Sequence, residues 1–182
     1  ELLIDESITG TERVRDIVLD LRCFAHGGRE TAVEADINAL LKASLRIAWN
    51  ELKYKCEVKQ EQSPLPPLRC YPKRLSQVFV NLLVNAGQAI EDHGTIIIAT
   101  HADDEAIVVK ITDDGQGIPP ELLSKIFEPF FTTKEIGQGT GLGLAISYTT
   151  VKRHGGDIEV FRTLGQGTTF LVRLPRQGIK DD

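Results

Sequence analysis

The fold of this chain is decided by four short segments: NLLVNA (residues 81–86), DDGQGI (113–118), FEPFFTTK (127–134) and GQGTGLGLA (137–145). In this order they bring two amides, a carboxylate and a glycine-rich stretch into one part of the chain. Amide oxygens suit a magnesium ion, and free backbone N–H groups suit phosphate. Together the four segments indicate chemistry for a nucleotide.

The composition excludes several classes of protein. With 182 residues, of which 41% are hydrophobic and 26% charged, the chain can bury one real core plus a small appendage. Its formal net charge of −5 argues against non-specific nucleic-acid binding, which requires a basic surface. No apolar run approaches the roughly 18 residues of a membrane span. We therefore expect a domain that itself contacts neither nucleic acid nor a membrane, and we expect it in the cytoplasm, as part of a parent protein that could be anchored in a membrane.

Cysteine and methionine usage adds two expectations. Cys23, Cys56 and Cys70 are odd in number and lack CxxC spacing, so free thiols in a reducing compartment are favoured over a zinc or redox site. Cys23 and His26 would give only half of a metal site. The chain contains no methionine and begins at Glu1, which indicates a piece of a longer protein.

Hydrophobic periodicity predicts the order of the elements. Apolar residues at helical spacing predict helices over 3–26, 36–52, 73–91, 119–126 and 141–154. Runs rich in β-branched residues predict strands over 55–61, 95–100, 106–112, 157–162 and 168–174, of which the second and third form a hairpin. The SPLPPL segment at 63–68 is a connector, because its three prolines remove backbone donors.

The predicted helix over residues 3–26 has one apolar stripe and a charged opposite face. Such a stripe must be buried against a partner. The helix could pack on its own domain, but a helix from a separate bundle or coiled coil fits the pattern better.

Asn81 and Asn85 stand four residues apart on one face of an otherwise apolar helix. Asparagine is a mediocre helix former, so the pair needs a reason. Both could be surface or capping amides. As ligands, their oxygens would be hard, neutral donors for Mg²⁺, which takes the rest of its shell from water and phosphate.

The DDGQGI segment places an acid at the end of a predicted strand, followed by Gly115 and Gly117. An Asp-Gly turn would explain the pattern equally well. Alternatively, the glycines let a ligand approach the backbone while the acid accepts a hydrogen bond. Asp113 is a better candidate for the buried acid than Asp114, because it continues the strand. An adenine amino group is a suitable donor.

The GQGTGLGLA segment alternates glycines and then enters a predicted helix. Free N–H groups at a helix N-terminus favour anions, so the segment is a candidate phosphate cradle. It lacks the GKT or GKS ending of the Walker loop, and it does not follow a strand as the dinucleotide fingerprint requires. Alone it would be weak evidence.

The order of the motifs resembles the ATP-binding catalytic domain of sensor histidine kinases. The asparagine helix, DxGxG, the Phe-rich segment and GTGLGLA correspond to that family's N, G1, F and G2 boxes, and GQGTTF follows at 165–170. The resemblance implies an α/β fold, a two-layer sandwich in which a mixed sheet packs on three helices. It also implies membership of the superfamily shared with chaperone, gyrase and mismatch-repair ATPases.

The resemblance implies a role for each motif residue. Asn85 would ligate Mg²⁺, and Asn81 would support the metal and phosphates, so these two are the expected catalytic residues. Asp113 would hold the adenine amino group of ATP. The other expected ATP contacts are Gly115, Gly117, Ile118, Phe127, Lys134, Gly139, Thr140, Gly141, Leu142, Gly143, Leu144 and Thr168.

One position departs from the family pattern. Many members carry Lys or Arg three residues after the second asparagine, where this chain has Gln88. A cationic phosphate contact from that helix is therefore not expected, and Lys134 of the lid could compensate. The lid implied by the resemblance spans residues 119–140.

The residue at position 81 also separates two reaction types. Hydrolytic relatives typically have glutamate there, which can deprotonate water, whereas Asn81 cannot act as that base. We therefore expect transfer of the γ-phosphoryl group to a histidine rather than hydrolysis. The alternatives are a hydrolytic ATPase clamp and a degenerate module that senses nucleotide without transfer.

The resemblance further implies boundaries and partners. Residues 1–28 would belong to a dimerisation hairpin, 29–176 to the ATP-binding domain, and 177–182 to a polar tail. The acceptor histidine would lie upstream of Glu1 in a homodimeric parent protein, which then phosphorylates the receiver domain of a response regulator. None of the four histidines present suits the acceptor role, and we expect each to be a surface or capping residue: His26, His93, His101 and His154.

Overall fold

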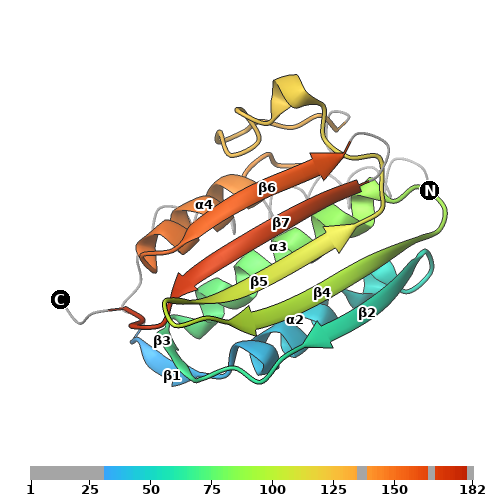
Figure 1. Cartoon of the computed structure of the whole chain (residues 1–182). Coiled ribbons are helices and arrows are strands. Elements are labelled where there is room, and N and C mark those ends of the chain that lie inside the picture. Colours follow the sequence, from blue (N-terminus) through green and yellow to red (C-terminus); the bar gives the residue numbers. More distant parts are fainter. Residues whose placement is uncertain (1–30, 135–138, 164–166, 180–182) are drawn as a thin grey trace, which may run out of the picture.

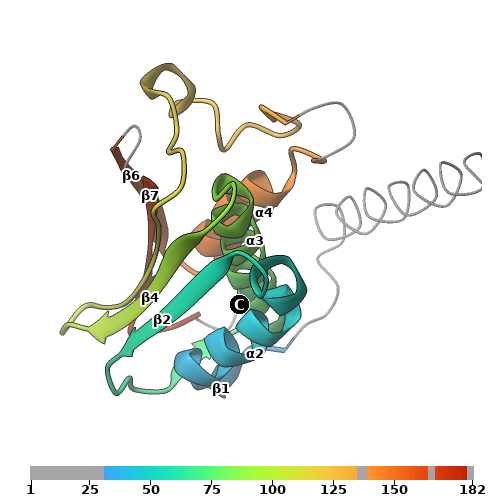
Figure 2. The ribbon, with the colours of Figure 1, turned by 90° about the vertical axis from the view of Figure 1, so that its right-hand side faces the viewer.

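Helix α3 (Pro72–Ala89) lies at the centre of the helical layer, between α2 (Ile37–Leu52) and α4 (Gly143–Arg153). The computed structural model describes residues 31–134, 139–163 and 167–179. Figures 1 and 2 show the three helices together on one face of a sheet. The helix predicted over 3–26 lies outside the described residues.

The sheet has five strands in the order β2-β4-β5-β7-β6. Strands β2 and β4 run parallel, and the other neighbouring pairs are antiparallel. A mixed sheet on three helices confirms the expected fold class, and the β4–β5 hairpin is confirmed as well. The strand bounds are β2 (Cys56–Gln62), β4 (Gly94–Ala102), β5 (Ala106–Asp113), β6 (Asp157–Thr163) and β7 (Gly167–Pro175).

Two further strands were not predicted. Strands β1 (Val33–Ala35) and β3 (Leu68–Cys70) form a small antiparallel sheet of their own. Each is three residues long. A period-2 pattern needs about four residues to be recognised, so the sequence gives no signal for such short strands.

Local chemistry explains where the first two helices begin. The Asp36 side chain caps α2 by accepting hydrogen bonds from the backbone N–H groups of Asn38 (2.8 Å) and Ala39 (3.2 Å), as the sequence predicted. Helix α3 begins at Pro72, whose fixed φ suits the first helical position.

The prediction of a helix over 119–126 is wrong. Only Pro120–Leu122 forms a short 3₁₀ helix, η1, and turns follow it. The bonding there is mostly to the third preceding residue, as in the bond from Lys125 N–H to Leu122 C=O at 2.9 Å. Two adjacent prolines remove donors at the start of the segment, so its apolar spacing does not produce an α-helix. Ile126 is nevertheless buried and anchors the segment.

The core lies between the helices and the sheet. Phe79, Leu82 and Leu83 of α3 are fully buried, and so are Ile96 and Ile98 of β4, in one hydrophobic cluster. Burial of this face of α3 leaves its asparagine face free for another use. Among the described residues, no helix is long and apolar enough to cross a membrane.

Candidate functional site

Asp113 is a buried carboxylate at the end of β5. Its side chain is 3% exposed, and its Oδ1 accepts hydrogen bonds from the N–H groups of Gly115 (3.0 Å) and Thr168 (3.3 Å). Burial raises the pKa of the Asp113 carboxyl above its usual value, although the two N–H bonds oppose the shift. Asp114 is exposed, so Asp113 is the buried acid, as predicted.

The turn after Asp113 packs directly on the end of α3. A Cβ atom at Gly115 would lie 2.4 Å from the carbonyl oxygen of Ala89, so only glycine fits. Next along the turn, the N–H of Gln116 donates to the same oxygen at 3.0 Å. The buried acid is thereby fixed beside the C-terminal turn of the asparagine helix.

Helix α4 begins without a capping side chain. Its N-cap is Leu142, and no cap hydrogen bond from that side chain is present. The Thr140 hydroxyl accepts instead from the Leu142 N–H at 3.3 Å, before the helix proper. Uncapped N–H groups at a helix start, with the positive end of the helix dipole, favour an anion. Gly139, Gly141 and Gly143 belong to this segment, as predicted, and Gly137 lies outside the described residues.

Asn81 joins α3 to the start of α4. Its amide nitrogen donates to the Gly143 carbonyl at 3.0 Å, and its amide oxygen accepts from Gln77 at 2.8 Å. Ser147, which is fully buried, donates to the same Gly143 carbonyl at 2.8 Å. Sequence reasoning missed Gln77 and Ser147. Their only signal was spacing, because Gln77 precedes Asn81 by one helical turn and Ser147 follows Gly143 by one.

Asn85 lies in the predicted helix and Thr168 in the predicted strand. Asn85 is half-buried on α3, one turn after Asn81 on the same face. Thr168 is buried on β7 directly opposite Asp113 in the ladder. The predicted residues therefore form two groups, one around the start of α4 and one around the end of β5, with the amide face of α3 between them.

The lid segment, described for residues 119–134 and 139–140, reaches back to α4. The Phe127 ring lies 5.3 Å from the Tyr148 ring of α4, and Ile118, Phe131 and Leu144 pack against the core. The Phe130 N–H donates to the Gly141 carbonyl at 2.9 Å. Gly141 has φ of +66°, and a Cβ there would lie 2.4 Å from the Phe130 carbonyl carbon. This contact requires glycine.

Lys134 extends from the lid to α3. Its ammonium donates to the side-chain oxygen of Gln88, the position at which the family pattern has a cation. Lys134 is half-buried. Removal from water lowers its pKa, and Glu51 opposes that shift.

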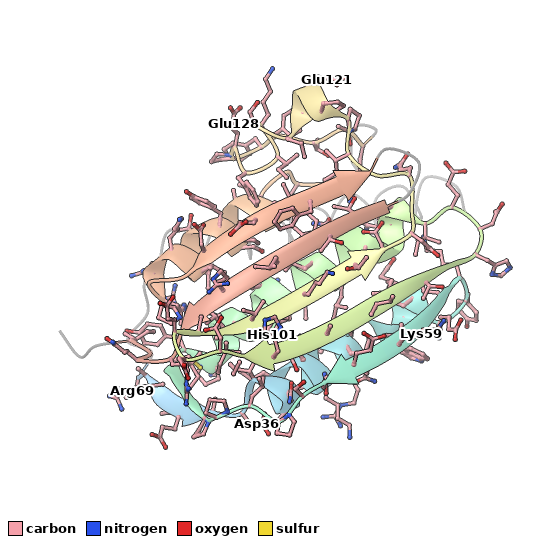
Figure 3. The ribbon with its side chains drawn as sticks, in the orientation of Figure 1. Asp36, Lys59, Arg69, His101, Glu121 and Glu128 are labelled. Carbon is pink, nitrogen blue, oxygen red and sulfur yellow. The ribbon has the colours of Figure 1, made fainter. Side chains whose placement is uncertain are left out.

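The three described histidines are surface or capping residues, as predicted. His93 and His101 are exposed, the latter on β4 (Figure 3). His154 is the C-cap of α4 but is buried, not a surface residue. Its Nδ1 is 2.7 Å from the Thr150 carbonyl, and its Nε2 accepts from the Tyr71 N–H at 3.1 Å. It therefore ties α4 to the start of α3. His26 lies outside the described residues.

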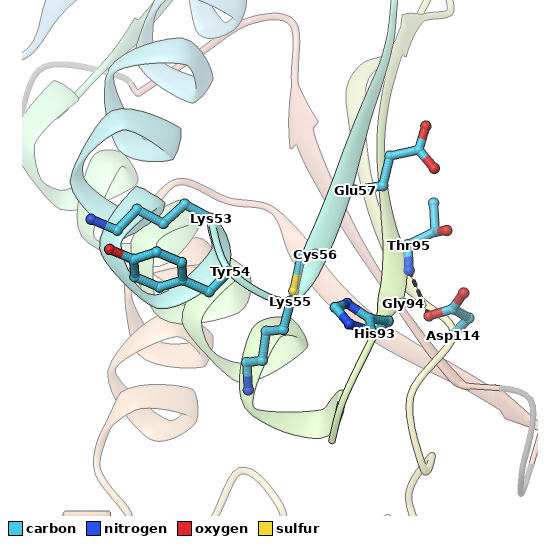
Figure 4. Close-up of a pocket in the computed structure, with 9 residues that line it drawn as sticks. All are labelled: Lys53, Tyr54, Lys55, Cys56, Glu57, His93, Gly94, Thr95 and Asp114. Carbon is cyan, nitrogen blue, oxygen red and sulfur yellow. Dashed lines mark hydrogen bonds between the residues drawn. The ribbon is translucent and has the colours of Figure 1, made fainter.

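A cavity of about 570 Å³ lies beside Asp114 of the DDGQGI segment, and Figure 4 shows the residues that line it. None of the predicted site residues lines it. Its wall includes the Asp114 carboxylate, which accepts from the Thr95 N–H at 2.7 Å. The complete lining is Lys53, Tyr54, Lys55, Cys56, Glu57, His93, Gly94, Thr95 and Asp114. The cavity is thus distinct from the candidate site.

The site can now be compared with known proteins. Residues 70–178 match the family described as histidine kinase-, DNA gyrase B- and HSP90-like ATPases. This match includes α3, β5 and α4. The chain belongs to this ATPase family.

Relatives of this ATPase domain include sensor histidine kinases. It is 38% identical to sensor histidine kinase ZraS of Escherichia coli over 143 residues, which are 77% of this chain and 30% of ZraS. The catalytic domain of histidine kinase ThkA, solved nucleotide-free, has 31% identity and a TM-score of 0.72, over 80% of this chain and 95% of that one. Full-length ShkA, solved in complex with AMPPNP, has 27% identity and a TM-score of 0.79, over 97% of this chain and 37% of ShkA.

These comparisons support the family named from the motifs. The chain contains the catalytic ATP-binding domain of a histidine kinase. Its fold matches solved catalytic domains of such kinases. The chain spans about a third of the length of ZraS. The activity and partners of the whole protein are therefore matters for proposal.

Proposed function

We propose that this chain is the ATP-binding catalytic domain of a sensor histidine kinase, and that it donates the γ-phosphoryl group of Mg-ATP to a histidine upstream of Glu1. One observation carries the proposal. The hydrogen bond from Asn81 to Gly143 sets the amide face of α3 against the uncapped start of α4. An anion with its counterion fits that juxtaposition.

Adenine binding would use the group around Asp113. The carboxylate accepts two N–H bonds through Oδ1, and an adenine amino group would donate to the other oxygen. Thr168 and Gly117 would lie around the base, with Ile118 beside it. Burial of the carboxylate without a cationic partner among its described neighbours costs stability, which is consistent with a ligand role.

Phosphate binding would use the group around α4. The backbone N–H groups of Gly141, Leu142 and Gly143 would donate to phosphate oxygens at the positive end of the helix dipole. Thr140 and Gly139 would complete the cradle, and Lys134 would add a positive charge.

Magnesium would be held by a neutral ligand. The Asn85 amide oxygen is of the kind Mg²⁺ accepts, and the ion would take its other ligands from phosphate and water. When bound, the ion neutralises phosphate charge. Asn81 would support the phosphates from the next turn of the helix.

The reaction would be an in-line transfer. A nitrogen of a neutral imidazole forms a bond to the γ-phosphorus while the bond to the β,γ-bridging oxygen breaks. ADP leaves with the electron pair, and the ring then loses a proton to solvent. Since Asn81 is no base for water, transfer to imidazole is favoured over hydrolysis. Positioning and charge neutralisation would supply most of the rate enhancement.

The proposed setting follows from this chemistry. The parent protein would be a homodimer whose phosphohistidine supplies an aspartate on the receiver domain of a response regulator. We place the domain in the cytoplasm, where ATP is available and where a thiol such as that of Cys56 stays reduced.

The experiment is titration of the chain with Mg-ATP by calorimetry, using Asp113→Asn and its neighbour Asp114→Asn. We expect the first substitution to weaken ATP binding at least about tenfold, because a hydrogen bond to a charged group is lost. Asp114→Asn keeps the acceptor for Thr95 and should bind as the wild type does. Equal affinities in all three proteins would refute the assignment of the adenine pocket.

A further inference from the structure

Helix α3 presents a stripe of neutral amides along the candidate site. Gln77, Asn81, Asn85 and Gln88 recur at intervals of four, four and three residues, so they share one face of the helix. Between Ser76 and Ala89 the helix has no charged side chain. The site therefore draws no positive charge from this part of α3.

Lys134 supplies a charge at the end of this stripe, and two hydrogen bonds hold it there. The ammonium donates to the Gln88 side-chain oxygen. The Lys134 N–H donates to the Thr132 hydroxyl at 3.2 Å, which forms a local turn. A Cβ at Gly139 would lie 3.2 Å from the Lys134 side-chain Cδ, so glycine at this position leaves room for the Lys134 side chain. The Lys134 ammonium thus joins the described part of the lid to α3.

The environment of this ammonium favours an anionic ligand. Gln88 is a neutral acceptor and leaves the positive charge uncompensated. Removal from water lowers the pKa of Lys134, and Glu51 offsets this effect only in part. A half-buried cation gains most from a multiply charged partner that reaches it inside the site.

We propose that Gln88 is a positioning residue, which holds the Lys134 ammonium over the amide stripe so that it binds the terminal phosphate of ATP. This inference rests on the proposed function and adds to it. Gln88 touches neither the reacting atoms nor the nucleotide. It acts through Lys134, and it ties the lid to α3 when ATP is bound.

The proposal predicts discrimination between nucleotides. Only ATP has the terminal phosphate, so the Gln88–Lys134 pair should strengthen ATP binding and leave ADP binding nearly unchanged. A purely structural role for Gln88 would instead affect both nucleotides equally. The ratio of ADP to ATP dissociation constants is therefore the informative quantity.

The experiment measures this ratio for four proteins by competition with a fluorescent nucleotide in the presence of Mg²⁺. They are the wild-type chain, Lys134→Gln, Gln88→Leu, and the swap Gln88→Lys with Lys134→Gln. The matched controls are Lys125→Gln, an exposed lysine of the same lid, and Gln60→Leu, an exposed glutamine of β2.

We expect Lys134→Gln to weaken ATP binding about tenfold, and ADP binding less than about twofold, because a charge-assisted bond to the terminal phosphate is lost. Gln88→Leu should weaken ATP binding about threefold, since the lysine stays but is no longer held. The swap should restore the ratio of ADP to ATP dissociation constants to within about threefold of the wild type. The ammonium then belongs to a residue of α3 and needs no glutamine to hold it there. Both controls should match the wild type.

Two results would overturn the inference while leaving the proposed function intact. One is an unchanged ADP-to-ATP ratio in Gln88→Leu. The other is a swap that binds ATP as weakly as Lys134→Gln does. Failure of the wild-type chain to bind either nucleotide would instead refute the proposed function, and the inference with it.

Discussion

At Asp113 the proposed ligand role is set against a cost to the fold. Its carboxylate is buried at the end of β5, and the N–H groups of Gly115 and Thr168 only partly replace the water it has lost. Its raised pKa expresses that cost. A buried charged group of this kind is typical of a functional site, where a bound ligand offsets the unfavourable free energy of burial.

Asp113→Asn should therefore stabilise the ligand-free chain at pH 7. The substitution removes a charge that burial disfavours, while its amide oxygen can still accept the two backbone N–H bonds. Thermal unfolding without nucleotide is the measurement, and a higher melting temperature than the wild type is expected. A clear drop in melting temperature would mean that the carboxylate stabilises the fold.

Asp113 also gives a pH dependence whose sign can be stated. Since its pKa in the folded state is raised, the stability associated with this group is present below the unfolded-state value and is lost as pH rises through the folded-state value. Affinity for ATP should change in the opposite direction, rising as the carboxylate forms. Comparison of the wild type with Asp113→Asn at each pH isolates this group. Parallel pH profiles for the two proteins would contradict the assignment.

At the scale of elements, the site depends on how α4 is held against α3. The Asn81 bond to Gly143 fixes the start of α4, and His154 fixes its end to the Tyr71 backbone at the start of α3. These two ties leave α4 little freedom to slide along α3. The proposed phosphate cradle is therefore placed by contacts at both ends of one helix.

His154→Leu tests the second tie. The substitution leaves the partly buried Tyr71 N–H without this acceptor, which should lower the free energy of unfolding by about 1–3 kcal/mol. His101→Leu, on an exposed position of β4, should change it by less than about 0.5 kcal/mol. Urea unfolding of both variants is the measurement. Equal stability of the two variants would show that the His154 contact contributes nothing.

The sequence predicted some elements better than others for physical reasons. Helices α2 and α3 and the β4–β5 hairpin were predicted because burial of one face leaves a clear periodicity. The helix predicted over 119–126 is not formed, because the apolar residues of this segment anchor turns rather than a helix face. Asp113 was recognised as the buried acid, but the bonds of Asn81 to Gly143 and of Lys134 to Gln88 join distant segments and leave no local signal.

At the scale of the whole molecule, a single layered fold assembles a site from segments far apart in sequence. The sheet places Asp113 opposite Thr168, and the helical layer places the amide face of α3 against α4. The lid then brings Lys134 to Gln88. The chain spans only about a third of a relative such as ZraS, and under the proposed function the acceptor of the phosphoryl group lies in a longer protein.

The most direct test is incubation of that longer protein with ATP labelled at the γ-phosphate. We predict protein-bound phosphate that is labile in acid and stable in base, as expected for phosphohistidine, and its loss in Asn85→Ala. Steady release of inorganic phosphate without a labelled protein would contradict the account, since it would show that this site hydrolyses ATP rather than transfers its terminal phosphate.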